Sequence, residues 1–82
     1  MYNLYILTKR GDIRDIKQTV GKRIRELRNK LGVSQEELAA MVELDRTYIT
    51  SVERGKRNIS IVNIEKLATA LNVSLAEFFT FE

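Results

Sequence analysis

The feature that most constrains the fold of this 82-residue chain is a pair of short helical patterns joined by a tight connection. The first pattern, residues 34–42, opens with a capping box, because Ser34 can accept from the backbone N–H of Glu37 while Glu37 reaches back. The second, residues 46–54, follows Asp45, a favoured N-cap residue. Gly55 comes next, where a left-handed C-cap is wanted. Apolar residues recur at helical spacing in both patterns, so each helix should bury one face.

Three further helices are predicted around this pair. From Ile13 onward, apolar residues step by three or four and predict an amphipathic helix that ends at Gly32. Gly21 lies inside it and costs about 1 kcal/mol relative to Ala, so we interpret it as the start of the helix or a bend. Ser60 should cap a fourth helix that ends at Asn72 and has an apolar face made of Ile61, Ile64, Leu67, Ala68 and Leu71.

The last helix is predicted over residues 75–81, opened by a second capping box of Ser74 and Glu77. These patterns give five helices and an all-α domain over residues 12–82. Residues 1–11 are predicted to be an N-terminal arm or a short strand. Their apolar stretch, Tyr2 to Thr8, fits either alternative.

Composition removes several classes of function. The chain has neither cysteine nor histidine, which excludes disulfides, Cys-ligated zinc and the commonest general base. We therefore expect no enzyme, no metal site and no cofactor. No apolar run is long enough to span a membrane, and no charged leader precedes a cleavage site. The chain should be soluble and cytoplasmic, with no membrane partner.

The charge of +3 is unevenly distributed. Residues 1–33 carry nine basic and three acidic side chains, a balance of +6, whereas residues 34–55 carry two basic and five acidic ones, a balance of −3. The basic N-terminal third suits a polyanionic partner. The alternative for the first helix is an ordinary solvated face.

The outer face of the helix at 46–54 is rich in hydrogen-bonding groups instead of the Glu and Lys of an ordinary solvated helix. It carries Arg46, Thr47, Tyr48, Thr50 and Ser51. Two short helices with a polar second helix and a basic loop after it form the layout of a helix-turn-helix, whose second helix lies in the DNA major groove.

Three stretches of the chain resemble the helix-turn-helix family of phage repressors, and in particular its small branch, the controller proteins of restriction–modification systems. They are Ser34-Gln35-Glu36-Glu37-Leu38-Ala39, Leu44-Asp45-Arg46-Thr47-Tyr48-Ile49 and Val52-Glu53-Arg54-Gly55-Lys56-Arg57-Asn58. The first is common to many members, and the other two indicate the controller branch. The resemblance runs from about Thr19 to Phe81. Ile59 departs from it, since proline is common there.

The resemblance implies roles for individual residues. DNA bases would be contacted by Arg46, Thr47, Tyr48, Thr50 and Ser51, and the DNA backbone by Gln35, Arg57 and Asn58. Half-buried packing is the alternative for Tyr48, and simple solvation for the loop residues. Arg28 and Glu53 would form a structural ion pair. Glu36, which the capping box does not need, would contact the sigma subunit of RNA polymerase.

A regulator of this kind would bind double-stranded DNA at a near-palindromic operator as a homodimer. By resemblance it would act on its own promoter and delay the restriction nuclease until methylation is established. We predict the dimer interface at the last helix, at Leu75, Phe78, Phe79 and Phe81, because one core cannot easily bury all three rings. The alternatives are a phage-type repressor, an antitoxin that regulates its own operon, and a protein-interaction module that uses the same fold without DNA.

Overall fold

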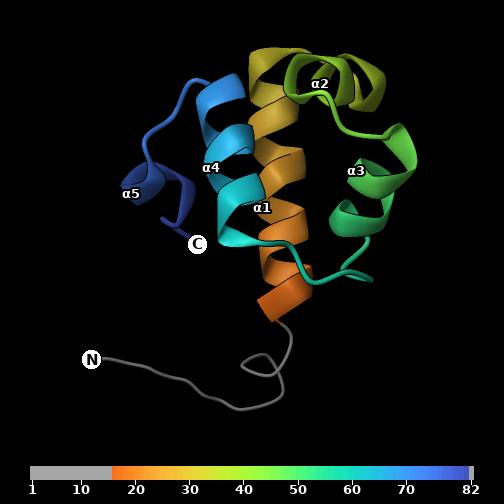
Figure 1. Ribbon diagram of the computed structural model, residues 1–82. Coiled ribbons are helices and arrows are strands. Elements are labelled where there is room, and N and C mark those ends of the chain that lie inside the picture. Colours follow the sequence, from red (N-terminus) through yellow and green to blue (C-terminus); the bar gives the residue numbers. More distant parts are fainter. Residues whose placement is uncertain (1–15, 82) are drawn as a thin grey trace.

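The computed structural model describes residues 16–81 and contains five helices and no strand in that part of the chain, so the predicted all-α fold is confirmed (Figure 1). The helices are α1 (Ile16–Leu31), α2 (Gln35–Val42), α3 (Arg46–Glu53), α4 (Ile61–Ala70) and α5 (Leu75–Phe78). The predictions for residues 1–11 and for Ile13 lie outside the described residues.

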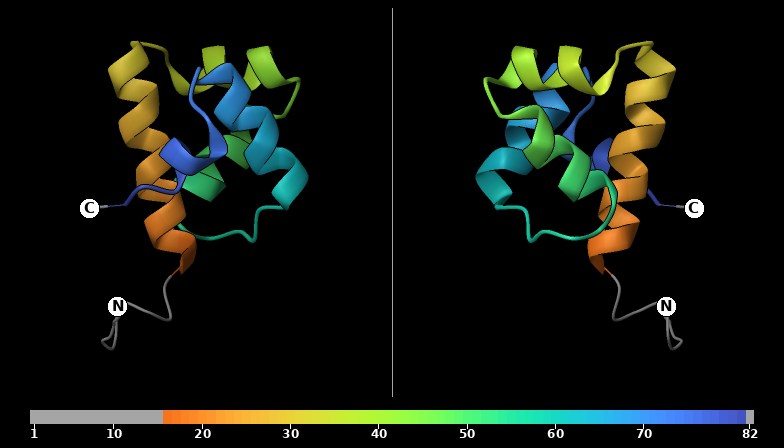
Figure 2. Two further views of the ribbon diagram at one scale, coloured as in Figure 1. Left: turned by 90° about the vertical axis from the view of Figure 1, so that its left-hand side faces the viewer. Right: turned by 90° about the vertical axis from the view of Figure 1, so that its right-hand side faces the viewer.

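The helices surround one apolar core, with α2 across one end of the molecule (Figure 1) and α1 along one edge, as the side views show (Figure 2). Figure 1 shows α5 and α3 on opposite sides of the molecule, and each of the side views in Figure 2 faces one of them. All five helices contribute to the core, which contains Val20, Ile24, Leu27, Leu38, Ala39, Val42, Ile49, Val52, Ile64, Leu67, Ala68, Leu71 and Phe78. This arrangement leaves the outer surface of α3 uncovered by α5.

Side chains cap the helices at the predicted positions. The Ser34 box is complete, with Glu37 N donating to Ser34 Oγ at 3.0 Å and Ser34 N donating to Glu37 Oε1 at 2.7 Å. Ser60 accepts from Asn63 N at 3.1 Å, and Ser74 accepts from Glu77 N at 3.0 Å, which is one of the two bonds of the second predicted box. Each cap satisfies a backbone donor that the helix itself cannot.

The connection between α2 and α3 is tight because Glu43 adopts the left-handed conformation, with φ 58°. Leu44 N then donates back to Ala39 O at 2.9 Å, which closes the end of α2. After α3, Gly55 has φ +73°, as the sequence predicted for a left-handed C-cap. These two turns set the direction in which α3 enters and leaves the domain.

The interpretation of Gly21 as the start of the first helix is wrong, because α1 already includes Ile16. Gly21 is buried within α1 and lies against the carbonyl groups that end α3. A Cβ placed there would lie 2.7 Å from Glu53 O and closer still to Val52 O. Glycine is therefore needed because the backbones of α1 and α3 come together at this point.

Two predictions about the later helices need correction. Ile61 does not belong to the apolar face of α4, since its side chain is 65% exposed. The last helix ends at Phe78 and not at residue 81, with Phe79 as its C-cap. Phe81 therefore lies beyond the helix, although the three rings still divide between core and surface as expected.

Candidate nucleic-acid interface

The N-terminal end of α3 is held by Asp45, whose Oδ1 accepts from Thr47 N at 2.9 Å and from Thr47 Oγ1 at 2.7 Å. The bond from the Thr47 hydroxyl, followed by that from its backbone N–H, lowers the pKa of Asp45 below its usual value. Arg46, the first residue of α3, is exposed. The cap thus presents the Arg46 side chain at the end of the helix that would enter a groove.

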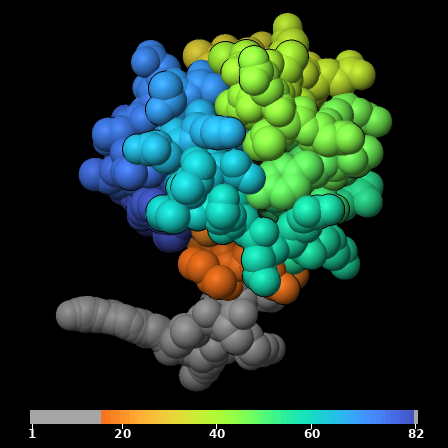
Figure 3. Space-filling model, viewed as in Figure 1, coloured from red at the N-terminus to blue at the C-terminus, as the bar shows by residue number. Residues whose placement is uncertain are grey.

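The outer surface of α3 continues into the following loop and α4 on one face of the molecule (Figure 3). Arg46 and Thr47 are exposed, whereas Thr50 and Ser51 are half-buried. These residues lie together on one helix, as predicted, and the roles assigned to them remain predictions.

Tyr48 packs at the side of this surface and joins α3 to the loop and to α4. Its ring is half-buried, and the Arg57 guanidinium carbon lies 5.0 Å from the ring centroid. Its hydroxyl accepts from Asn63 Nδ2 at 3.1 Å. Tyr48 is therefore packed and half-buried, which places Arg57 next to α3, and its contact with a DNA base stays a prediction. Sequence reasoning missed Asn63, which no local pattern indicates.

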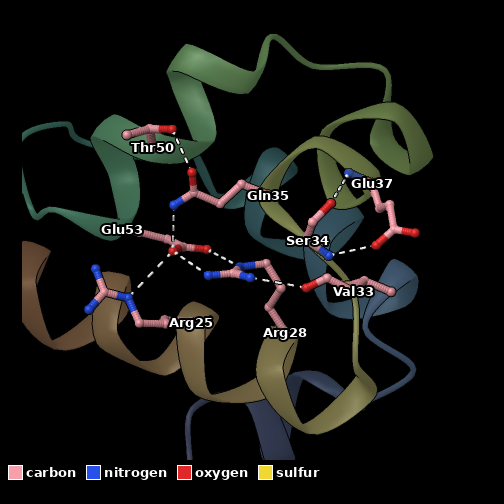
Figure 4. Close-up of polar contacts among 8 residues, drawn as sticks. All are labelled: Arg25, Arg28, Val33, Ser34, Gln35, Glu37, Thr50 and Glu53. Carbon is pink, nitrogen blue, oxygen red and sulfur yellow. Dashed lines mark hydrogen bonds and ion pairs between the residues drawn. The ribbon is translucent and has the colours of Figure 1, made fainter.

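A buried carboxylate joins α1, α2 and α3 behind this surface (Figure 4). Arg28 donates to both oxygens of Glu53, Nε at 2.7 Å and Nη2 at 3.1 Å, so the predicted ion pair is present. Two partners of Glu53 were not predicted: Arg25 Nε at 3.5 Å and Gln35 Nε2 at 3.0 Å. The Glu53 side chain has no exposed surface.

Burial alone would raise the pKa of Glu53. The hydrogen bonds from Arg28 and Gln35, together with the charges of Arg28 and Arg25, outweigh burial and hold its pKa below the usual value. Glu53 is therefore an ionised carboxylate that only accepts hydrogen bonds.

Gln35, predicted to contact a phosphate, turns its side chain toward the protein. Its amide lies between Glu53 and Thr50, whose hydroxyl donates to Gln35 Oε1 at 2.9 Å. Glu36 beside it is exposed and takes no part in the Ser34 box. An open recess between the first turns of α2 and α3 is lined by Arg28, Ser34, Gln35, Glu36 and Arg46.

The predicted dimer residues divide into two groups. Phe78 is fully buried in the core, so its side chain cannot reach a partner and the prediction for Phe78 is wrong. Leu75, Phe79 and Phe81 are each about 40% exposed, and the rings at 79 and 81 meet edge to face at 6.1 Å. Arg23 also holds α5, because its Nε donates to Phe78 O at 3.0 Å and its Nη2 to Glu77 O at 2.6 Å.

Within residues 16–81, no cluster of three or more acidic side chains could hold a metal ion. In the same part of the chain, no helix is long and apolar enough to cross a membrane.

Comparison with known proteins agrees with this geometry. The helix-turn-helix family matches residues 24–78. The chain is 48% identical over 67 residues to the control protein C.MunI from a Mycoplasma species, a match that covers 80% of this chain and 90% of that protein. The chain belongs to the helix-turn-helix family.

Solved structures point to the same branch of this family. The restriction–modification controller protein C.AhdI from Aeromonas hydrophila matches with a TM-score of 0.75 and 53% identity, over 78% of this chain and 97% of that chain. C.Esp1396I, solved as a tetramer in complex with its natural 35 base-pair operator, matches with a TM-score of 0.73 and 39% identity. This match covers 78% of this chain and 84% of that chain. The chain therefore groups with restriction–modification controller proteins, which are DNA-binding transcriptional regulators and not enzymes.

Proposed function

We propose that this controller protein binds a near-palindromic operator at its own promoter as a homodimer, in the cytoplasm. The observation that carries the proposal is the outer surface of α3, which is polar, open and begins at exposed Arg46. Arg57 lies beside the same helix, over Tyr48. Two cationic side chains thus flank a row of hydroxyl groups, which suits a DNA groove between phosphates.

In the proposed complex, α3 lies in the major groove. Arg46 is placed to donate to the O6 and N7 atoms of guanine, and the Thr47 methyl to meet a thymine methyl. Tyr48, Thr50 and Ser51 make the further base contacts. Arg57 and Asn58, both exposed, contact the DNA backbone.

Gln35 is the least direct of the proposed contacts. One amide hydrogen of Gln35 is used on Glu53. The second is left for a phosphate near the N-terminal end of α2, where the backbone N–H groups also favour an anion.

The homodimer is proposed to form through Leu75, Phe79 and Phe81. These apolar side chains are partly exposed and lie at α5 and just beyond it. Figure 1 shows α5 on the opposite side of the molecule from α3. An exposed apolar patch is a common partner site. Pairing two copies would set two α3 helices on half-sites about one DNA turn, or roughly 34 Å, apart. The solved tetramer of C.Esp1396I on its operator supports DNA binding by an oligomer.

The experiment is selection of bound duplexes from a random pool by the intact chain, followed by affinity measurements on the selected duplex over a range of salt concentrations. We expect an inverted repeat and an affinity that falls steeply as salt rises. Enrichment of a single unrepeated site would contradict the dimer, and no enrichment would contradict sequence-specific binding.

We further propose that Glu36 contacts the sigma subunit of RNA polymerase. Glu36 is exposed on the first turn of α2 and is free of the capping box, which Glu37 supplies. In a promoter reporter assay, Glu36→Gln should keep operator binding and lower activation. Full activation by this variant would contradict the contact.

A further inference from the structure

The side chain of Gln35 connects a buried charge to the outer surface of α3 (Figure 4). On one side, Gln35 Nε2 donates to Glu53 Oε1 at 3.0 Å. On the other, Gln35 Oε1 accepts from Thr50 Oγ1 at 2.9 Å. Thr50 and Glu53 both belong to α3, so the amide of α2 bridges two positions on the helix proposed to read DNA.

The ionised Glu53 determines which way the Gln35 amide points. A carboxylate accepts hydrogen bonds and donates none, so the group that faces it must be the amide NH₂. Rotating the amide by half a turn would set two acceptor oxygens 3.0 Å apart. Arg28 and Arg25 keep the carboxylate charged and in place. Gln35 Oε1 is therefore the atom that faces Thr50.

The direction of the amide in turn determines the direction of the Thr50 hydroxyl. A hydroxyl has a single hydrogen, and here it is donated to Gln35. The lone pairs of Thr50 Oγ1 stay free. At about 100° per residue, Thr50 lies between Arg46 and Thr47 around the axis of α3, and its half-buried side chain stands at the edge of the outer surface, next to α2.

We propose that Glu53, acting through Gln35, fixes Thr50 as a hydrogen-bond acceptor and so makes it a specificity-determining residue for a base amino group. This inference rests on the proposed function. In the major groove the donors are the N6 amino group of adenine and the N4 amino group of cytosine. Guanine N7 and O6, thymine O4 and the phosphates offer only acceptors, with which this hydroxyl cannot pair. Glu53 and Gln35 are positioning residues, and Thr50 touches the base.

The test removes one functional group at a time from the bases of the selected operator. Each adenine is replaced by purine and each cytosine by 2-pyrimidinone, which lack the amino groups, and 7-deazapurines remove the N7 acceptors. Affinities are measured for the intact chain and for Thr50→Val, which keeps the shape of the side chain but has no oxygen. At one position in each half-site we expect loss of the amino group to weaken the intact chain about tenfold. Thr50→Val should bind the unmodified operator and the operator without this amino group with the same affinity.

Two more variants distinguish the hydrogen-bond chain from Glu53 through Gln35 to Thr50 from simple packing of the Thr50 side chain. Thr50→Ser keeps the hydroxyl and should keep the amino-group dependence. Gln35→Met leaves the hydroxyl in place but frees its hydrogen, so the same operator position should then tolerate a base that presents an acceptor. Thermal unfolding of each variant checks that it is folded.

The proposal is overturned if the effect of Thr50→Val on affinity disappears when an N7 atom, and not an amino group, is removed. It is also overturned if no base replacement changes the effect of Thr50→Val, or if Gln35→Met leaves the base preference unchanged. Failure of the proposed function looks different, because the intact chain would then select no duplex at all.

Discussion

Arg28 and Glu53 form a two-pronged ion pair that joins α1 to the end of α3, with donor–acceptor distances of 2.7 and 3.1 Å. The same guanidinium donates through Nη1 to Val33 O at 3.0 Å, in the connection between α1 and α2. One side chain thus fixes the relative positions of three helices. The pair lies behind the surface of α3 that we propose faces DNA.

Replacing Arg28 should destabilise the fold strongly. Arg28→Met leaves the fully buried Glu53 carboxylate with weaker partners, and we expect a loss of about 3 kcal/mol in the free energy of unfolding. Arg25→Met is the matched control, because Arg25 contacts the same carboxylate at 3.5 Å but its side chain is 53% exposed. The control should cost less than about 1 kcal/mol. Urea unfolding, monitored by circular dichroism, measures the free energy of unfolding of both variants. Equal losses would contradict the assignment of Arg28 as the main partner of Glu53.

The low pKa of Glu53 should make stability depend on pH. In the unfolded chain this carboxyl has its ordinary pKa of 4.5, and in the folded chain its pKa lies lower. Folding therefore favours the charged form, so the contribution is complete well above pH 4.5 and is lost as pH falls through the folded pKa. Between pH 6 and pH 3, unfolding free energy should fall less steeply for Glu53→Gln than for the intact chain. If unfolding free energy falls equally steeply with pH in both proteins, another titratable group determines the pH dependence of stability.

Arg46→Ala should weaken binding to the selected operator by about 1–3 kcal/mol and relax the preference at one base pair in each half-site. Arg57→Ala should weaken binding to all sequences alike and make the salt dependence shallower. Lys66→Ala, an exposed change on α4, serves as a control. Fluorescence anisotropy with operator and mismatched duplexes measures all three. Unchanged affinity for Arg46→Ala would show that this residue does not read a base.

The double variant Phe79→Ala, Phe81→Ala should shift the chain from dimer to monomer in sedimentation at micromolar concentration. Some thermal stability should be lost as well, because each ring is only about 40% exposed and Phe79 also contacts core Phe78. Operator binding should weaken because each half-site would then be bound alone. A monomeric intact chain would contradict the dimer, and a dimer in both proteins would place the interface elsewhere.

Gly21→Ala tests the close approach of α1 and α3. In an exposed helix this change would stabilise by about 1 kcal/mol. Here the added Cβ would collide with Val52 O and lie 2.7 Å from Glu53 O. Because these are backbone atoms that cannot rotate away, we expect a net loss of about 1–3 kcal/mol in denaturant unfolding. Gly32→Ala is the comparison, since it meets no atom within 4 Å and is opposed only by its φ of +83°. A stabilised Gly21→Ala would contradict the close packing.

The sequence by itself determined the helices, their caps and the polar surface of α3. These depend on contacts between residues at most four apart, such as the bonds between Ser34 and Glu37, and on a helical period that can be read directly from the chain. The pairing of Arg28 with Glu53 came from a family resemblance, because nothing local joins residues 25 positions apart.

Only the tertiary structure decided which way particular side chains face. Phe78 and Phe79 are neighbours of the same residue type, yet Phe78 is buried and Phe79 is partly exposed. Phe78 is the last residue of α5 and Phe79 is its C-cap, so the two side chains leave the backbone in different directions. The need for glycine at position 21 arises from Val52 and Glu53 of α3, which lie 31 and 32 residues further along the chain. The direction of the Thr50 hydroxyl likewise depends on Gln35, 15 residues away. Such contacts form only when the packed core brings distant segments together, so no local pattern in the sequence contains them.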